Sequence, residues 1–327
     1  MLEIVKPGLE TSIQDFPGRI GYWNQGFPPS GPLDMWSFRL ANLVVGNDES
    51  AAGLEAQFMG PTIRFQRAGV IALAGADMRP RLDGEPLPMW ESVAVSAGQT
   101  LAMGPAVSGA RGYLAVAGGI DAPEWLGSAS TFHKAGVGGL DGHAIQAGQV
   151  LPVKEADGTP GRRVADAARP RFAEGKTWEI EAVRGPNDDW VDDAGHERFA
   201  TTEWLLEARS DRTGYRLRGP DWTFTPKATD KLPEHGDFPS NIIDQGYPLG
   251  AVNLGGQTPI ILMNDGPSMG GFICPYTVPS AAFWKLGQMK PNEYIRFREV
   301  SVDEAQALRL ALDEACAPGS IEREESS

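Results

Sequence analysis

Short apolar runs with alternating polar positions dominate the chain, and glycine, proline or aspartate bounds most of them. Such runs are typical of β-strands, because side chains point alternately to the two faces of a strand. In the first half of the chain the runs are Leu2–Val5, Thr62–Phe65, Val70–Ala74, Ser92–Val95, Thr100–Met103 and Tyr113–Ala117. In the second half they are Thr177–Val183, Thr213–Leu217, Pro259–Met263 and Tyr294–Phe297. Because helices do not alternate regularly with these runs, the pattern predicts a mainly β protein built as a barrel or a sandwich.

Helices are few in this pattern. One is predicted over Met35–Val45, with Asp34 as its N-cap and Gly46 as the residue that ends it. Its core-facing side chains are expected to be Trp36, Leu40, Leu43 and Val44. The spacing of Ser301 and Glu304 is that of a capping box.

The capping box predicts a second helix over Val302–Cys316. A further short helix is expected in the sequence before Trp204–Glu207. The remaining chain is predicted to consist of strands, turns and loops. The fold is therefore expected to be mainly β with a few short helices.

A short phrase recurs along the chain. Ala97–Leu101 (AGQTL) and Ala147–Leu151 (AGQVL) are near copies, and Leu286–Gln288 (LGQ) is a looser third. A glycine turn that leads into a strand would produce this phrase, which suggests similar β-modules. By contrast, Lys154–Lys176 lacks apolar periodicity and is rich in Ala, Gly, Pro and Arg, as a domain boundary or a long surface loop would be. We therefore expect a β-rich half over 1–155, a β-barrel half over 175–300, and a C-terminal helix and tail over 301–327.

Charge restricts the possible partners. The chain has 327 residues and a formal net charge of −14. Nucleic acid and membranes are therefore not expected as main partners, since phosphate binding needs clustered Lys and Arg. The N-terminus, MLEIVKPGLE, lacks the basic patch and apolar run of a signal peptide, and no apolar segment approaches the ~20 residues of a membrane span. The cytoplasm is the expected compartment.

Familiar catalytic motifs are largely absent from the sequence. There is no GxxxxGK[ST] P-loop, no HExxH motif and no cluster of His and Cys, so neither a nucleotide site nor a metal site is predicted. The scattered histidines leave a Ser–His–Asp triad open, although no GxSxG elbow supports one. Cys274 and Cys316 lie far apart in the sequence and are expected to be small buried or bystander thiols.

The stretch from Gly26 to Glu55 is the first polar candidate site. Its Pro28–Pro32 turn (PPSGP) fixes several φ angles and can hold Ser30 and backbone amides rigidly against a small ligand. Asp34 then either caps the following helix or faces a pocket.

Three further polar residues of this stretch leave alternatives open. Arg39 and Asn42 are either surface residues or hydrogen-bond donors for a carbonyl group. Glu55 is either a charge at the rim of a site or a buried acid paired with Arg39.

The second polar candidate site is Pro239–Pro275, where Asn241, Asp244, Asn253 and Asp265 lie among many glycines. A buried-strand run ends just before Asp265, and Ser268, Gly270 and Gly271 follow. Polar residues on a glycine turn at the end of a strand are a common way to build a small-molecule site. The alternative for Asp265 is an Asx turn over the next glycine.

Other polar and aromatic residues are weaker candidates. Arg209, Asp211 and Arg212 are expected to form surface ion pairs, which contribute little to stability. Trp190, Trp204 and Trp222 are expected in the core or in a lid rather than in a stacking platform.

Long segments of the chain resemble one family. SIQDFPGRIGYW followed by GFPPSGPLDMWSFRLANLVVGNDESAAGLE is similar to the allophanate hydrolase subunit 2 family, and ARGYLAVAGGID, SDRTGYRLRGP and the Pro239–Pro275 stretch also fit it. The family comprises carboxyltransferase halves of urea carboxylase and a related subunit of bacterial 5-oxoprolinase. The match runs from Gly8 to about Phe297. It implies a β-rich fold with cyclophilin-like barrels.

The resemblance also implies partners. The chain would be one half of a biotin-dependent carboxyltransferase, and subunit 1 would supply the other half. Biotin carboxylase, where ATP is used, and the biotin carrier would be further partners in a hetero-oligomer. Since the chain has no Met-Lys-Met motif, biotin is expected on the carrier rather than on this chain.

Under this resemblance the two polar stretches would form the site. The expected catalytic carboxylates are Asp34, Glu55 and Asp265. The expected contacts to substrate or biotin are Ser30, Gly31, Arg39, Asn42, Asn241, Asp244, Asn253, Ser268, Gly270 and Gly271. Backbone amides at Ser30–Gly31 and at Gly270–Gly271 would stabilise a developing oxyanion. No metal is expected at this step.

The substrate follows from the branch of the family. NDGPSMGGFICP and PSNIIDQGYPLGAVNLGG look closer to the urea carboxylase branch, which implies transfer of CO2 to a nitrogen of urea, guanidine or a similar amide. One alternative is a 5-oxoprolinase subunit that acts with ATP-using partners. Another is a regulatory protein that antagonises a kinase inhibitor, as some relatives are described to do.

Overall fold

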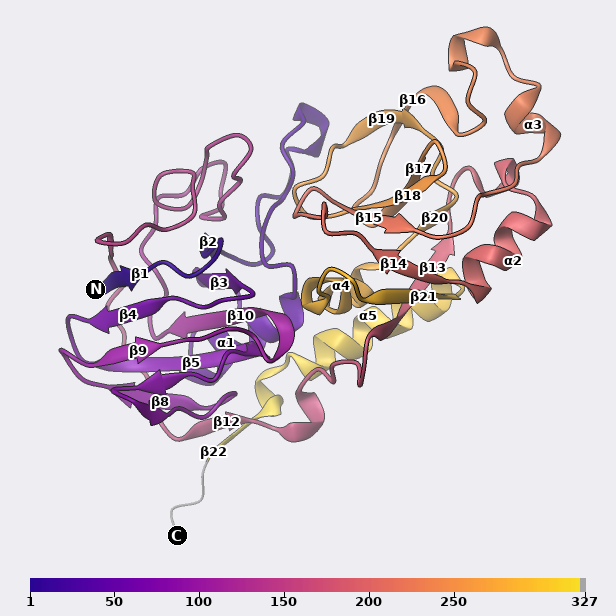
Figure 1. The fold of residues 1–327 in the computed structure, drawn as a ribbon. Helices are drawn as coiled ribbons and strands as arrows, with labels where there is room; N and C mark the ends of the chain where they lie inside the picture. Colours follow the sequence, from indigo (N-terminus) through magenta and orange to yellow (C-terminus); the bar gives the residue numbers. More distant parts are fainter. Residues whose placement is uncertain (324–327) are drawn as a thin grey trace. The chain divides into compact units, whose positions relative to one another are not determined.

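The computed structural model describes residues 1–323 and divides into two compact units (Figure 1). The first unit comprises Met1–Ile20, Pro29–Phe172 and the chain from Leu312 onward, and the second comprises Gly21–Pro28 and Ala173–Ala311. The short segment Gly21–Pro28 thus belongs with the second half of the chain. The expected ranges 1–155, 175–300 and 301–327 stay a prediction of domain organisation, and residues 324–327 of the expected tail lie outside the described residues.

The first unit contains two antiparallel sheets. The first sheet has the order β11-β1-β4-β9-β6-β7, with β1 (Leu2–Lys6), β4 (Thr62–Phe65), β6 (Arg81–Leu82), β7 (Glu85–Pro86), β9 (Thr100–Ala102) and β11 (Val150–Leu151). The second has the order β2-β3-β10-β5-β8, with β2 (Ser12–Gln14), β3 (Gly53–Gln57), β5 (Gly69–Asp77), β8 (Ser92–Val95) and β10 (Ser108–Val116). A pair formed by β12 (Arg162–Val164) and β22 (Ile321–Arg323) completes the unit.

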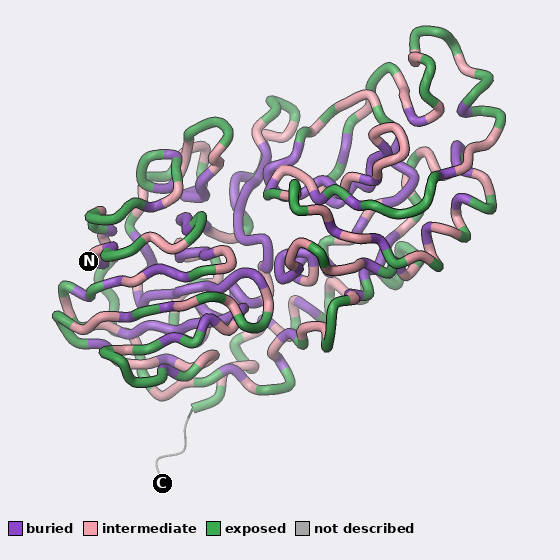
Figure 2. Tube along the Cα trace, in the orientation of Figure 1, coloured by how far each residue is buried: buried purple, intermediate pink, exposed green. Residues whose placement is uncertain are grey.

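Apolar side chains from both sheets form one core. Ile4 and Ile63 of the first sheet and Leu73 and Leu114 of the second belong to the same buried cluster. Burial is continuous along most of β5 and β10, whereas β1 and β4 also contain exposed or half-buried positions (Figure 2). Tyr113 points to the opposite face of β10, because neighbouring side chains alternate along a strand. The second sheet therefore has one apolar face and one face that receives polar side chains and a helix.

That helix is α1 (Met35–Val45), which packs against β5 and β10. Its bounds, the Asp34 cap and the Gly46 stop are as predicted from the sequence. The predicted apolar stripe was too narrow: Trp36 and Leu43 are only half-buried, whereas Phe38, Ala41 and Val45 are also buried. The helix is covered on more than one side, since it contacts β12 as well as the sheet.

The recurring phrase is a repeated turn. Ala97–Leu101 and Ala147–Leu151 each place a glycine at positive φ, 88° for Gly98 and 85° for Gly148. In both, the glutamine side-chain oxygen accepts the backbone N–H three residues earlier, at 2.8 and 2.7 Å. The third phrase, Leu286–Gln288, lies in helix α4 (Phe283–Gln288), so its inclusion was wrong.

The second unit is built on a closed barrel with the order β13-β20-β17-β18-β15-β14-β21. Its strands are β13 (Thr177–Arg184), β14 (Glu203–Leu206), β15 (Gly214–Arg218), β17 (Ala251–Gly255), β18 (Thr258–Leu262), β20 (Tyr276–Thr277) and β21 (Tyr294–Glu299). A separate two-stranded ribbon pairs β16 (Asn241–Gly246) with β19 (Met269–Phe272). The prediction of a mainly β fold with a barrel is confirmed.

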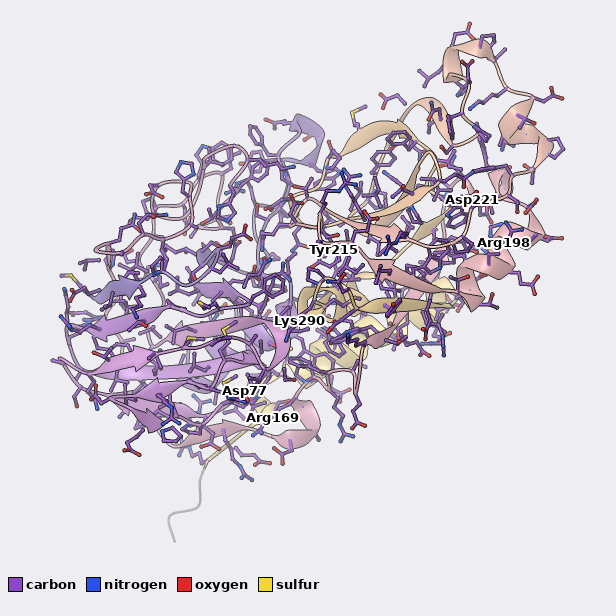
Figure 3. The ribbon with its side chains drawn as sticks, viewed as in Figure 1. Asp77, Arg169, Arg198, Tyr215, Asp221 and Lys290 are labelled. Carbon is purple, nitrogen blue, oxygen red and sulfur yellow. The ribbon has the colours of Figure 1, made fainter. Side chains whose placement is uncertain are left out.

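Short helices accompany the barrel. They are α2 (Asp193–Thr201), α3 (Pro226–Thr229) and α4, and the longer α5 (Val302–Ala315) passes from the second unit into the first after Ala311. Both the helix expected before Trp204 and the helix after the Ser301 capping box are confirmed, and Glu304 N–H donates to the Ser301 hydroxyl at 3.1 Å. Arg198 of α2 donates to the carbonyl of Asp221 at 2.8 Å (Figure 3).

Aromatic rings fill the space between α2 and the barrel. The ring of Phe199 stacks on Tyr276 at 3.8 Å and on Phe297 at 4.2 Å between centroids. Trp204 and Trp222 stack at 5.7 Å and are buried, as is Trp190. The expectation that these tryptophans are packing residues is confirmed.

Two further findings concern the burial of the cysteines and the length of the helices. Cys274 and Cys316 are both buried free thiols, as expected, and burial raises their pKa to about 11 and about 12. Among residues 1–323, no helix has the length and apolar character needed to cross a membrane.

His196 of α2 joins the helix to the barrel. Its Nε2 donates to the carbonyl of Asp188 at 3.0 Å, so Nδ1 accepts from the Tyr276 hydroxyl at 2.7 Å in the neutral ring. The Glu299 carboxylate lies 3.5 Å from the same hydroxyl and pairs with Arg184 at 2.8 Å. Burial, and then the charge of Arg184, lowers the pKa of His196.

This lowered pKa predicts loss of stability in acid. Between the lowered native pKa and the unfolded value of about 6.5, the unfolded chain binds the proton more readily, so the free energy of unfolding falls as the pH drops through this window. His196→Gln should show a smaller fall between neutral pH and mild acid in denaturant titrations. The exposed His143→Gln is the control and should behave like the wild type. An unchanged pH slope in His196→Gln would contradict the assignment.

Candidate active site

The loop before α1 has a constrained backbone. Ser30 and Gly31 follow one another at φ 55° and 78°, in the left-handed region. A Cβ on Gly31 would lie 3.2 Å from the carbonyl oxygens of both Asp15 and Pro17, so a side chain there would be crowded as well as strained. Asp34 then caps the helix: its carboxylate accepts the backbone N–H of Ser37 at 2.9 Å and the hydroxyl of the same residue at 2.5 Å.

Glu55 holds the same loop from the sheet below. Its Oε2 accepts the N–H of Leu33 and the hydroxyl of Tyr113, each at 2.8 Å. The Tyr113 oxygen in turn accepts the N–H of Asp34 at 2.8 Å. Burial, and then the Glu55 charge, raises the pKa of Tyr113 well above its ordinary value. The hydroxyl is therefore kept protonated as a donor to Glu55.

The pairing expected for Glu55 is corrected. Glu55 is a buried acid with 3 % exposure, and its Oε1 lies 3.6 Å from Nε of Arg111 rather than beside Arg39. Arg39 pairs instead with Glu49 at 2.8 Å and Asp313 at 2.6 Å. Sequence reasoning could not choose between these arginines, because Arg111 reaches Glu55 only through the pairing of β3 with β10.

The surface alternative for Arg39 and Asn42 is also wrong. Both residues are buried. Asn42 donates to the carbonyl of Ala51 at 2.8 Å and accepts from Asn47 at 2.9 Å. These bonds join the end of α1 to the start of β3, so the residues have defined partners within the protein. Their contacts to a ligand stay a prediction.

A second buried polar cluster supports this loop and was missed from the sequence. The Asp15 carboxylate accepts the hydroxyls of Ser128 and Ser130, each at 2.5 Å. Arg19 donates to the carbonyl of Ser130 at 2.9 Å, and its own N–H donates to Pro29 at 2.7 Å. The signal in the sequence was the run of small residues at 128–131, three of which carry a hydroxyl group.

In the second unit the ribbon gathers several predicted residues. Asn241 and Asp244 lie on β16, and Gly270 and Gly271 lie on β19 with Ser268 just before it. The register pairs Gln245 with Gly270 and Asn241 with Phe272. The structure therefore brings these predicted residues onto one ribbon.

Tyr247 fixes the end of this ribbon. Its hydroxyl accepts the N–H of Phe272 at 2.7 Å and donates to the carbonyl of the same residue at 2.9 Å. A Cβ at Gly270 would lie 2.8 Å from the Tyr247 ring, so the ring needs a glycine there. Burial raises the pKa of Tyr247 to about 12, and the phenol stays protonated. Trp23 donates to the Tyr247 carbonyl at 3.0 Å, which ties the segment Gly21–Pro28 to this unit.

Asp265 follows β18 and is buried. Its Oδ2 accepts Nε of Arg212 at 3.0 Å, and its N–H donates to the Arg212 carbonyl at 2.8 Å. Arg212 is only 7 % exposed, so its expected place in a surface ion pair was wrong. The N–H of Gly266 donates to the Met263 carbonyl at 2.8 Å, which satisfies the turn through backbone atoms without the Asp265 side chain.

The buried side-chain oxygens of this unit that have no hydrogen-bond partner within residues 1–323 include Oδ1 of Asp265 and Oδ1 of Asn253. Asn253 lies on β17 opposite Ile260 of β18 and is 3 % exposed. Both atoms can only accept hydrogen bonds. They are therefore suited to a ligand that offers N–H groups.

The predicted site residues form one group in each unit. Ser30, Gly31, Asp34, Arg39, Asn42 and Glu55 surround the start and length of α1, and the others lie on or beside β16 to β19. That the two groups make a single site stays a prediction. No group of His, Cys, Asp and Glu suited to a metal ion occurs in the described part of the chain.

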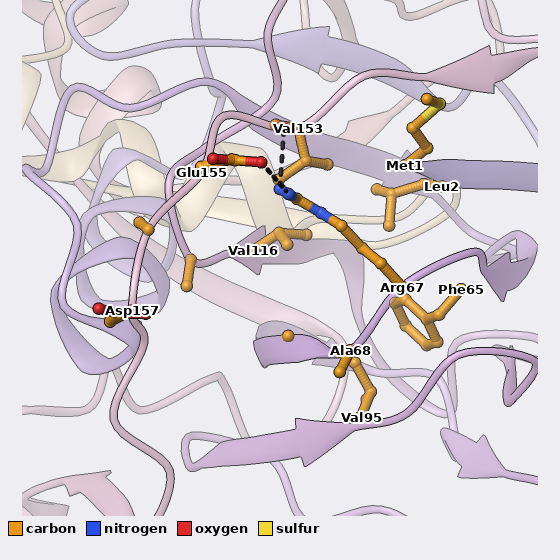
Figure 4. A pocket seen from close by; sticks show the side chains of 13 residues that line it. Met1, Leu2, Phe65, Arg67, Ala68, Val95, Val116, Val153, Glu155 and Asp157 are labelled. Carbon is orange, nitrogen blue, oxygen red and sulfur yellow. Dashed lines mark hydrogen bonds and ion pairs between the residues drawn. The ribbon is translucent and has the colours of Figure 1, made fainter.

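A pocket of about 400 Å³ in the first unit lies away from these residues (Figure 4). Arg67 crosses it and donates to the carbonyls of Val153 and Lys154, each at 2.9 Å, with Glu155 at 3.6 Å. It contains none of the predicted site residues, so it adds nothing to the candidate site.

The sequence of the chain matches one family of domains. The family model for the carboxyltransferase domain, subdomains A and B, matches residues 25–299. This chain therefore belongs to that carboxyltransferase family, and the resemblance noted in the sequence is confirmed.

Known proteins of two kinds are similar to this chain. It is 42 % identical to urea amidolyase of Saccharomyces cerevisiae over 96 % of this chain and 17 % of that protein. It is 35 % identical to a subunit of 5-oxoprolinase of Escherichia coli over 94 % of each. A crystal structure of K. lactis urea amidolyase covers all of this chain with a TM-score of 0.93 and 36 % identity, and this chain spans 20 % of it. The chain thus spans only about a sixth to a quarter of the urea amidolyase and urea carboxylase relatives.

The Asp34 cap leads to a prediction about the stability of the protein. Asp34→Ala should lower the free energy of unfolding by about 0.5–2 kcal/mol, because the Ser37 N–H loses its acceptor, whereas Asp34→Ser keeps an acceptor and most of the stability. Chemical denaturation measures both, with Asp192→Ala at the cap of α2 as the matched control. A fully stable Asp34→Ala would disprove the cap.

Proposed function

We propose that this chain is part of a biotin-dependent carboxyltransferase that moves CO2 from carboxybiotin to a nitrogen of urea or a urea-like molecule such as guanidine or an amide. The main support is the similarity to urea amidolyase, which extends over 96 % of this chain at 42 % identity and is accompanied by a TM-score of 0.93 to a homologous structure. The buried acceptors Asp265 and Asn253 fit the same chemistry. A urea-like substrate and the ureido ring of biotin both present N–H groups to such oxygens.

Carboxybiotin brought by a partner supplies the carboxyl group: its N–CO2 bond breaks, the substrate nitrogen bonds to that carbon, and the nitrogen's proton passes to biotin. The residues of this chain orient and stabilise the reactants. Asp265 accepts an N–H of the substrate and directs the nitrogen towards the carbon. Asn253 holds a second polar group of the substrate.

The other predicted residues complete this arrangement. In the second unit, backbone N–H groups of Gly270 and Gly271 donate to the oxygen on which negative charge develops. Asn241, Asp244 and Ser268 contact the substrate or biotin from the ribbon. Asp34, Glu55, Arg39 and Asn42 act by holding the loop and α1, since each already has partners within the protein.

We further propose that the remaining parts act in trans. This chain spans 17 % of the yeast urea amidolyase but 94 % of the E. coli 5-oxoprolinase subunit, so both a fused and a separate arrangement exist among its relatives. The expected partners are a subunit 1, a biotin carboxylase that uses ATP, and a biotin carrier.

The second candidate is a subunit of 5-oxoprolinase, which acts with ATP-using partner subunits on 5-oxoproline. The similarity to the E. coli protein favours it, because the two chains align over nearly their whole lengths. It differs from the first proposal in its substrate and in having no need for biotin.

The test is substrate-stimulated ATP turnover. This chain is combined with its subunit 1, biotin carboxylase and biotinylated carrier in bicarbonate, and urea, guanidine or 5-oxoproline is added separately. We expect urea or guanidine to raise turnover, because carboxybiotin is regenerated only when its CO2 is transferred. Avidin should abolish the rise, and so should omission of this chain.

The outcomes distinguish the candidates. Stimulation by 5-oxoproline alone, insensitive to avidin, would replace the first proposal with the second. No stimulation by any of the three, with all partners bound, would contradict both. Carboxylated product measured from labelled bicarbonate separates true transfer from uncoupled ATP hydrolysis.

A further inference from the structure

Arg212 and Asp265 are joined by a side-chain ion pair and by a backbone hydrogen bond. The side chains meet at 3.0 Å, and the backbone N–H of Asp265 donates to the Arg212 carbonyl at 2.8 Å. A second backbone bond runs from Met263 to Thr213 at 3.1 Å. These bonds continue the pairing of β15 with β18 beyond the strand ends. The guanidinium and the carboxylate therefore start from backbones fixed to each other.

The turn after Asp265 leaves little freedom. A Cβ at Gly266 would lie 2.9 Å from the carbonyl oxygens of both Met263 and Thr213. Only glycine fits without moving one of these segments. The path of the chain through 263–266 is thus set by the same two segments that carry the ion pair.

The two oxygens of Asp265 are used unequally. Oδ2 accepts from Arg212, whereas Oδ1 is buried and finds no donor in the part of the chain that the structure describes. An unsatisfied buried acceptor costs free energy, so it persists where something else supplies the donor. Arg212 is permanently charged and keeps a compensating charge beside the carboxylate without covering Oδ1.

Other buried acids in the protein show the contrast. Glu181 in the same unit accepts from Lys285 with both oxygens, each at 2.8 Å. Glu55 uses Oε2 for two donors and places Oε1 beside Arg111. Those carboxylates have partners at both oxygens, as structural ion pairs require. Asp265 is held at one oxygen only.

We propose that Arg212 is a positioning residue: it fixes Asp265 through Oδ2 so that Oδ1 accepts an N–H of the reacting substrate. The inference rests on the proposed function, in which Asp265 contacts the substrate. Arg212 itself acts through Asp265 and does not contact the substrate. Its Nε donates a charge-assisted hydrogen bond to Oδ2 at 3.0 Å, which a flexible lysine ammonium would reproduce less well.

The experiment is a double-mutant cycle in the reconstituted complex. Arg212→Gln should lower kcat/KM for urea or guanidine by about 10–100-fold, the usual effect of losing a residue that orients a functional group. Arg212→Lys should recover part of this loss. The double variant Arg212→Gln/Asp265→Asn should be no slower than Asp265→Asn alone, because Arg212 has no effect once its carboxylate is gone.

Lys285→Gln is the matched control, since it breaks a buried ion pair of the same unit that has no unsatisfied oxygen. It should lose stability in thermal unfolding yet keep kcat/KM. If Lys285→Gln lost as much kcat/KM as Arg212→Gln, or if the effects of Arg212→Gln and Asp265→Asn on kcat/KM were additive, the positioning role would be overturned. The proposed function would stand in either case. No avidin-sensitive turnover in the wild-type complex would overturn the proposed function and this inference with it.

Discussion

Burial of carboxylates is the constraint on which both units depend. A carboxylate out of water is tolerated only when charges and donors replace its hydration. In the first unit Glu55 meets this condition with an arginine, a phenol and a backbone N–H, and these bonds join β3, β10 and the start of α1. In the second unit Asp265 meets it only in part. The buried carboxylate of the first unit therefore has its partners within the protein, whereas that of the second unit keeps one oxygen that can accept a further hydrogen bond.

The framework around Glu55 explains the opening loop. Pro28–Pro32 carries two consecutive residues at positive φ, which cost free energy unless the surroundings fix them. The hydrogen bonds that fix the loop come from Glu55 and Tyr113 on the sheet, and from the cluster of Arg19 and Asp15. A loop held this firmly keeps its backbone in one conformation, and stabilisation of a developing charge requires such a backbone, which does not reorganise. Rigidity and the expected role of the loop thus have the same source.

Local signals in the sequence predicted part of this structure. The bounds of α1 followed from Asp34 and Gly46, because a cap and a stop act within a few residues. The ribbon strand β16 was not predicted, since its polar residues and glycine give no alternating pattern. The barrel order was also beyond prediction, because β13 pairs in parallel with β21 over more than a hundred residues. Patterns within a strand do not reveal such distant neighbours.

The site residues likewise fall into those that local sequence signals predict and those that depend on distant parts of the chain. Asp265 was predicted from its place after a strand, but Arg212 was not, because 53 residues separate the partners and only the barrel brings them together.

The pairing of Arg212 with Asp265 bears on the choice between the two candidate functions. Urea and guanidine bring N–H groups without negative charge, whereas 5-oxoproline also carries a carboxylate, which a nearby Asp265 would repel unless another cation faced it. In the proposed site, an acceptor oxygen held by a charge that is already paired suits the N–H groups of a urea-like substrate, and a 5-oxoproline carboxylate would need a positive group facing it.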